Sequence, residues 1–157
     1  MKNGILIYKM HIKDNHIFCI MKTIFDVFDN NFTSICNALE DSNFRGSVYC
    51  STELIRISDL LGFEDGILIG EILESTINQL SSEIGSYEIP KEEKAALMAS
   101  LITQIKIISN CYKNENKNEL FAALQKFRNL ATKFQYNCRR NYKSTQKRFD
   151  PLEILRR

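Results

Sequence analysis

The chain has 157 residues, with 44% hydrophobic and 25% charged side chains and a net charge of +2. This size and composition predict one domain around one core, and two Pro and six Gly exclude collagen-like and linker-like classes. Unbroken apolar runs are only a few residues long, so no segment is expected to span a membrane.

The first fifteen residues show a short period. Tyr8, Met10 and Ile12 alternate with polar side chains, which predicts an edge strand or an extended arm. Met21 is a plausible alternative start, so this stretch could also be an upstream extension. We expect a single domain over residues 1–157, made of an arm at 1–20, a helical bundle at 21–141 and a basic tail at 142–157.

From Lys22 onward the period becomes helical. Five apolar side chains then recur every three or four residues and form one face of a helix: Phe25, Phe28, Phe32, Ile35 and Leu39. We expect residues 43–46 to break this helix. A shorter helix should follow over about 51–61, with Gly62 as its C-terminal stop.

The next helix is expected over about 64–83, ended by Gly85. Its apolar stripe consists of Ile69, Leu73, Ile77, Leu80 and Ile84. Gly66 and Gly70 lie one turn apart, and two interpretations stay open. Either the two glycines allow a close crossing with another helix, or one is a loop glycine and the other is exposed on the helix surface.

Two further helices follow, each with a start signal. Pro90 and the acidic residues after it predict the first start, and its stripe is Leu97, Leu101, Ile105, Ile108 and Tyr112, widened by Ala95, Ala96 and Met98. Asn116 and Glu119 have capping-box spacing and predict the second start. The second stripe is Leu120, Leu124, Phe127, Ala131, Phe134 and Cys138, and the periodicity fades after Arg140.

Together these stripes predict an all-α fold: a bundle of four to five amphipathic helices with a short extended N-terminal arm. Any strand should lie within the first fifteen residues. Five side chains are expected to be largely buried: Phe28, Leu101, Ile105, Leu124 and Phe127.

Charge is distributed unevenly along the chain. Residues 1–50 carry no net charge, residues 51–100 carry −7, and residues 101–157 carry +9. This asymmetry indicates a polyanionic partner, self-association of opposite ends, or internal pairing.

The last predicted helix and its tail carry the strongest functional signal. No acidic residue occurs between Leu120 and Phe149. We predict a nucleic-acid-binding site made of the cations in this stretch: Lys126, Arg128, Lys133, Arg139, Arg140, Lys143, Lys147 and Arg148. Cations spaced along a rod match a phosphate backbone.

Three of these cations, Lys126, Lys133 and Arg140, are seven residues apart and therefore line one face of the helix. Aromatic side chains that could stack on bases lie among the cations: Tyr136, Tyr142 and Phe149. Two other interpretations stay open: the face binds a protein partner or another copy of the chain, or it is solvated or docked on the acidic middle of the same chain.

Metal sites are not expected. Glu71 and Glu74 are one turn apart, but carboxylate-bridged sites in bundles use Glu-x-x-His pairs, and the chain has no such pair. His11, His16 and Cys19 match no recognised zinc spacing.

Catalysis is not expected either. Both His lie in the N-terminal arm, and the chain has no nucleophile elbow, phosphate-binding loop or dinucleotide glycine pattern. We therefore predict a protein that is not an enzyme and has no cofactor. The five Cys are irregularly spaced without a Cys-x-x-Cys pair, and Lys9 interrupts the first apolar run too early for a signal peptide. We expect a cytoplasmic protein whose Cys fill the core.

Residues 54–69 are similar to a helix-turn-helix, with Gly62 at the turn. The second of these helices would begin with Glu64 and Asp65, and carboxylates are repelled by the phosphates that border a major groove. We therefore favour a tight corner between two helices.

The leading hypothesis is a non-enzymatic helical subunit or adaptor of a larger nucleic-acid-binding assembly. Its basic helix would contact the backbone of RNA or single-stranded DNA without sequence specificity, and copies could associate head to tail. In overall character such a chain looks like the small helical subunits of CRISPR effector complexes, an analogy at the level of the fold. The alternative is a protein-interaction module of the inhibitor, immunity or antitoxin type whose basic face binds an acidic partner. A small enzyme with an unfamiliar site is the third class.

Overall fold

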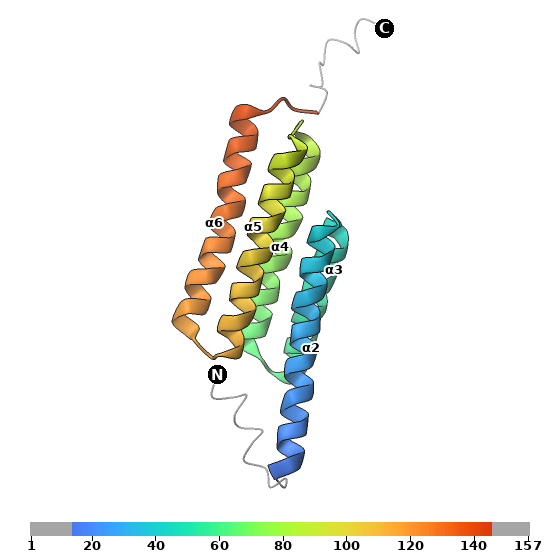
Figure 1. Cartoon of the computed structure of the whole chain (residues 1–157), viewed down its shortest axis with the longest axis vertical. Coiled ribbons are helices and arrows are strands. Elements are labelled where there is room, and N and C mark those ends of the chain that lie inside the picture. Colours follow the sequence, from blue (N-terminus) through green and yellow to red (C-terminus); the bar gives the residue numbers. More distant parts are fainter. Residues whose placement is uncertain (1–13, 146–157) are drawn as a thin grey trace, which may run out of the picture.

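The computed structural model describes residues 14–145, with side chains from Asp26 onward. Its helices are α2 (Asp14–Glu40), α3 (Phe44–Leu61), α4 (Glu64–Ser86), α5 (Lys91–Lys113) and α6 (Lys117–Asn141). They run alternately up and down, joined by short turns (Figure 1). The predicted all-α bundle is therefore confirmed. Between residues 14 and 145, extended pairing is limited to an isolated bridge of Tyr87 with Ser144.

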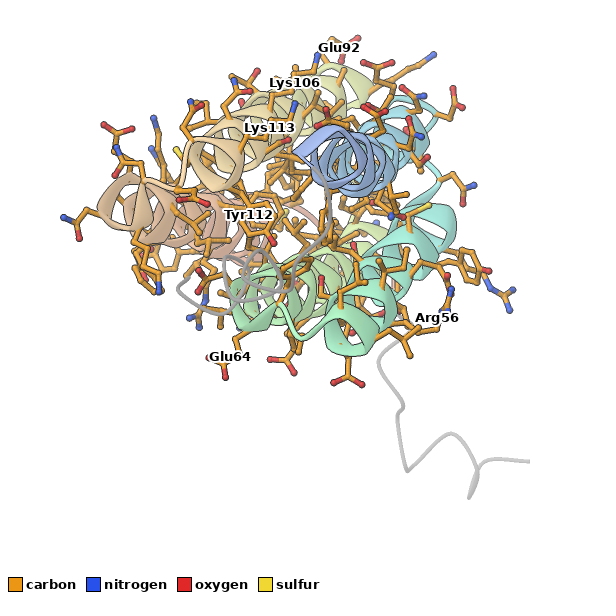
Figure 2. The ribbon with its side chains drawn as sticks, turned by 90° about the horizontal axis from the view of Figure 1, so that it is seen from below. Arg56, Glu64, Glu92, Lys106, Tyr112 and Lys113 are labelled. Atoms are coloured by element: carbon orange, nitrogen blue, oxygen red, sulfur yellow. The ribbon has the colours of Figure 1, made fainter. Side chains whose placement is uncertain are left out.

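The five helices between residues 14 and 145 close into a ring. Helix α2 packs on α3, α3 on α4, α4 on α6, α6 on α5, and α5 back on α2; Figure 2 views this arrangement from one end. Because an odd number of helices alternates in direction, one neighbouring pair in the ring must be parallel, and this pair is α4 and α6.

Ion pairs join the matching ends of the parallel pair. Near the two N-termini, Lys117 Nζ lies 3.7 Å from Asp65 Oδ2. Near the two C-termini, Arg139 pairs with Glu83, whose side chain is only 14% exposed. The charged contacts of α6 with the acidic middle of the chain are therefore local, at the two ends of the seam with α4.

The core lies inside the ring and consists of the predicted stripes. All five side chains that we expected to be buried are at most 2% exposed. Two of the expected core residues on α5, Ala95 and Ala96, are exposed instead. Gln104 is buried at the contact with α6, where its Nε2 donates to the carbonyl oxygen of Ala123 at 3.1 Å.

Helix α2 begins earlier than the sequence pattern predicted. Residues 14–20, which we assigned to an extended arm, are helical. The reason is visible in the spacing, because Ile17, Met21 and Ile24 continue the period of three and four residues that leads to Phe28. The lower part of α2 extends past the ends of the other helices (Figure 1). The rest of the predicted arm, residues 1–13, lies outside the described residues.

Helix α3 also begins earlier, at Phe44 rather than near Ser51. We expected Asn43 to break a helix. It lies in the turn between α2 and α3, and it is also the N-cap of α3. Its side-chain Oδ1 accepts a hydrogen bond from Gly46 N at 2.9 Å, which satisfies one of the free donors of the first turn.

Glycine behaves differently at the two expected helix ends. Gly62 has φ of 70° and caps α3, as predicted. Gly85 does not end α4, which continues to Ser86. No neighbouring atom lies within 4 Å of the position that a Cβ on Gly85 would take, so nothing opposes the helix there.

Gly66 and Gly70 allow α3 and α4 to approach closely. A Cβ on Gly70 would lie 2.5 Å from Ile55 Cγ1 and 3.1 Å from Ile55 N. A Cβ on Gly66 would lie 2.3 Å from Ser58 Oγ. The close-crossing interpretation of the two glycines is therefore confirmed.

Besides Ile55, the α3 side of this contact includes the small residues Ser51 and Ser58, which are fully buried. The two helices lie antiparallel along their lengths, whereas the helices of a helix-turn-helix meet at about 90–120°. The favoured interpretation, a tight corner, is confirmed.

The described cysteines are free thiols. Cys36, Cys111 and Cys138 are buried and Cys50 is half-buried. Burial raises the pKa of each of these thiols, which keeps them protonated and apolar in character. The expectation that Cys fills the core is confirmed for these three buried residues; the side chain of Cys19 lies outside the description.

Within residues 14–145, none of the helices combines the length and the apolar character that a membrane span requires.

Candidate nucleic-acid interface

Helix α6 turns one face to the core and the opposite face to solvent. Its inner face is the predicted stripe, in which Phe134 is half-buried and the other five residues are buried. Asn116 caps the helix through its Oδ1, which accepts from Glu119 N at 3.2 Å, as the capping-box spacing predicted. The buried stripe fixes the rotation of the helix and therefore the direction in which its cations point.

Three predicted site residues form one row on the exposed side. Lys126, Lys133 and Arg140 are all exposed, and successive members are about 10 Å apart along the helix axis. Lys126 follows Ala123 by one turn, and Ala123 contacts Gln104 of α5, so this row borders α5. We call these three residues the cation row. None of them forms an ion pair with another residue of the described range.

Two other predicted residues lie on the opposite flank of α6, toward α4. Arg139 donates to Glu83 of α4, and this bond raises the pKa of the guanidinium. Arg128 precedes Arg139 by three turns, so it lies on the same flank, exposed. The two flanks differ: the one toward α4 is partly neutralised, and the cation row is not.

Of the three remaining predicted cations, the structure describes one. Lys143 is exposed just beyond α6, and its backbone oxygen accepts from Glu88 N at 2.9 Å. Lys147 and Arg148 lie outside the described residues.

The surface of α5 beside the cation row is uncharged over several turns. Gln104 shows which face of α5 turns toward α6, and Ser100 and Ile107 lie one turn to either side of it. Both are exposed, as are Ala96 and Thr103 near them. A ligand on the cation row would therefore meet uncharged side chains of α5 rather than the carboxylates of α4.

Between the two flanks lies the outermost strip of α6, which is polar without acidic groups. Gln125 Nε2 donates to Asn129 Oδ1 at 2.9 Å. Tyr136 lies farther along the same strip with 63% of its surface exposed. It follows Lys133 by three residues and precedes Arg140 by four, so both cations neighbour its ring on the helix surface.

Tyr142 has a structural role that the sequence did not indicate. Its hydroxyl donates to the carboxylate of Glu93, and this hydrogen bond raises the pKa of the phenol to about 12. It is half-buried, whereas Phe149 lies beyond the described range. Of the three aromatic residues predicted to stack on bases, Tyr136 is the exposed one among those described.

The segment after α6 is bound to the turn between α4 and α5. Thr145 N donates to Ser86 O, and Thr145 Oγ1 donates to Gly85 O, each at 2.9 Å. With the bond between Glu88 and Lys143, these contacts fix the upper end of α6 and the base of the predicted tail. The sequence contained no signal for this, because the segments that pair are more than fifty residues apart.

A groove of about 460 Å³ lies between α2 and α5 on another side of the molecule. Its walls carry both charges: Lys113 pairs with Asp29, and Lys106 lies opposite Glu40. Figure 2 shows Lys106 and Lys113 along α5 near α2. The Cys36 thiol at its base has its pKa raised by burial and by Glu40, while Lys106 acts in the opposite direction.

The prediction that the chain has no metal site stays a prediction. Glu74 accepts from Thr52 at 3.3 Å, and no group of three or more His, Cys, Asp or Glu converges within the described residues. The side chains of His11, His16 and Cys19 lie outside that range.

Comparison of the chain with family models, with curated proteins and with solved structures finds no match.

Proposed function

We propose that this chain is a non-enzymatic helical subunit or adaptor of a nucleic-acid-binding assembly, and that α6 lies along the phosphate backbone. The observation that carries the proposal is the cation row, Lys126, Lys133 and Arg140, exposed and without a carboxylate partner among the described residues. The cations of α6 that do have acidic partners are Lys117 and Arg139, at the seam with α4.

The binding would be electrostatic. Each phosphate that a cation neutralises releases condensed counterions, and this release supplies most of the affinity of non-specific complexes. Three contacts would give a slope of log affinity against log salt of about −2 for a single strand and about −3 for a duplex. The straight row, about 20 Å long, suits a linear polyanion better than a compact one.

The test is a fluorescence-anisotropy titration of short labelled RNA and DNA at several salt concentrations. Lys133→Ala should weaken binding of all sequences about equally and reduce the salt slope by up to about one unit. Lys106→Ala is the matched control, because it removes the same charge from an exposed site on the α2 side of α5. It should change affinity far less.

A double charge reversal, Lys133→Glu with Arg140→Glu, should abolish binding while the far-UV circular dichroism stays helical, because exposed charges contribute little to folding. The proposal fails if the unmodified protein shows no salt-dependent binding below about 100 µM, the weak end of non-specific affinity. If the reversal instead abolishes association with an acidic protein, the cation row belongs to a protein-interaction module.

A further inference from the structure

The aromatic ring of Tyr136 on α6 is exposed. Its exposed fraction is 63%, and its hydroxyl forms no hydrogen bond with another described residue. Tyr142, by contrast, donates a hydrogen bond to Glu93, and Tyr112 is half-buried against the core. A single exposed aromatic side chain is common on protein surfaces, so its exposure alone decides nothing.

The exposure of the Tyr136 ring matters because the ring lies next to two exposed cations. Lys133 is one turn below Tyr136 and Arg140 is one turn above it, so the ring lies between two members of the cation row. The nearby Arg139 is held by Glu83, which leaves no free carboxylate from that pair to repel a phosphate. A flat apolar surface flanked by two cations matches one nucleotide with its two neighbouring phosphates.

Single and double strands differ in what they offer to such a ring. In a duplex the faces of the bases are stacked on one another, so a protein helix on the backbone reaches phosphates and sugars only. In a single strand the base faces are accessible, and stacking on an aromatic side chain tolerates any base. The ring therefore adds affinity for a single strand and none for the backbone of a duplex.

This inference rests on the proposed function. We propose that this face of α6 binds single-stranded RNA or DNA, with one base stacked on Tyr136 and the flanking phosphates bound by Lys133 and Arg140. The substrate class is thus narrowed from any linear polyanion to an unpaired strand.

The experiment compares labelled oligo(U), oligo(dT) and a DNA duplex with matched phosphate number, bound to the full chain at fixed salt. Tyr136→Ala should weaken binding to the single strands by roughly 5- to 150-fold, the range for loss of one stacked base. It should leave the duplex within about twofold. Tyr136→Phe retains the ring and should retain the affinity for all three probes.

Two controls separate stacking from general effects. Phe121→Ala removes the other large exposed aromatic side chain of α6, 51% exposed and outside the cation row, and should leave all three affinities within about twofold. The chain has no Trp, so tyrosine emission is directly observable. Oligo(dT) should quench part of it in the original protein, and Tyr136→Phe should remove that part of the quenching.

The outcomes are distinguishable from those of the proposed function. If all probes bind with the expected salt dependence but Tyr136→Ala is neutral, or weakens single strands and duplex equally, the stacking inference is overturned and the backbone contact stands. If no probe binds in a salt-dependent way, the proposed function itself fails. A loss confined to oligo(U) or to oligo(dT) supports the inference and identifies which of these two strands stacks on the ring.

Discussion

The α3–α4 and α5–α6 hairpins achieve close packing by opposite means. Between α3 and α4 the contact depends on missing side chains, because Gly66 and Gly70 face the small residues and the backbone of α3. Helices α5 and α6 contribute large side chains to the core, with Leu101, Ile105 and Phe127 fully buried. Added atoms should therefore destabilise the α3–α4 contact, and removed atoms should destabilise the α5–α6 side of the core.

The largest expected effect is on the α5–α6 side. Phe127→Ala should lower the free energy of unfolding by about 3–5 kcal/mol, because the ring is fully enclosed and its loss leaves a cavity. Urea unfolding measures this directly. Phe121→Ala, on the same helix but 51% exposed, is the control and should lose far less. A loss below about 1 kcal/mol for Phe127→Ala would place the core on a different face of α6.

The matching change on the α3–α4 side adds one methyl group. Gly70→Ala should destabilise by about 1–3 kcal/mol, because the new Cβ meets the backbone of Ile55 and Ser51, which cannot move aside alone. Gly85→Ala in the same helix is the control. It meets no atom within 4 Å and should stabilise by about 0.5–1 kcal/mol through helix propensity. Equal gains from both variants would show that α3 and α4 do not need their close approach.

Tyr112 lies where the two hairpins meet. We expect its phenol to lower the free energy of unfolding at alkaline pH. The label in Figure 2 places it toward the middle of the ring, and its side chain packs edge-on against Phe28 with ring centroids 5.5 Å apart. Burial, with a smaller effect of Asp65, raises the pKa of this phenol to about 12. The neutral form is therefore favoured by folding.

Because the pKa of Tyr112 is raised in the folded state, the neutral phenol contributes fully to the free energy of unfolding below pH 10. This contribution is lost as the pH rises from 10 to 12. The loss should be on the order of 2 kcal/mol. Urea unfolding at pH 8 and pH 11 should show a smaller alkaline loss for Tyr112→Phe than for the original protein. Tyr142→Phe controls for the other phenol of raised pKa; if both variants behave alike, burial at the ring centre is not the cause.

The smallest expected effect tests the polar atoms inside the α3–α4 contact. Ser58 Oγ is buried and has no hydrogen-bond partner among the described residues, so Ser58→Ala should stabilise by about 1 kcal/mol. Ser51 is the matched control, since its Oγ donates to Ser47 O at 2.9 Å. Ser51→Ala should be neutral or slightly destabilising. The same gain at both positions would mean that the hydrogen bond of Ser51 contributes nothing.

The helical period predicted most of the fold because each helix buries only one face. The stripes of α4, α5 and α6 could be read directly from the spacing of their apolar residues. The start of α2 could not, because residues 8–12 alternate with the period of a strand directly before the helical spacing that begins at Ile17 and Met21. Asn43 is equally typical of a break and of an N-cap, and only the bond to Gly46 N distinguishes them.

The candidate site could be predicted where it depends on one helix. The seven-residue spacing of the cation row and its separation from the core stripe both follow from the sequence of α6. The partners of Arg139 and Tyr142 could not be predicted, because they depend on which helices are neighbours in the ring. The order of the helices along the chain does not indicate that α6 lies beside α4.

The odd number of helices among the described residues also determines how far apart the start of α2 and the end of α6 lie. Helix α2 starts at one end of the bundle and α6 finishes at the other (Figure 1). Because α2 extends past the other helices, a connection from the end of α6 back to the start of α2 would span more than the length of α6, which is about 37 Å, and therefore more than about 11 extended residues. The end of α6 in one copy and the start of α2 in a second copy could meet without any such span, because these two helix ends lie at opposite ends of the bundle.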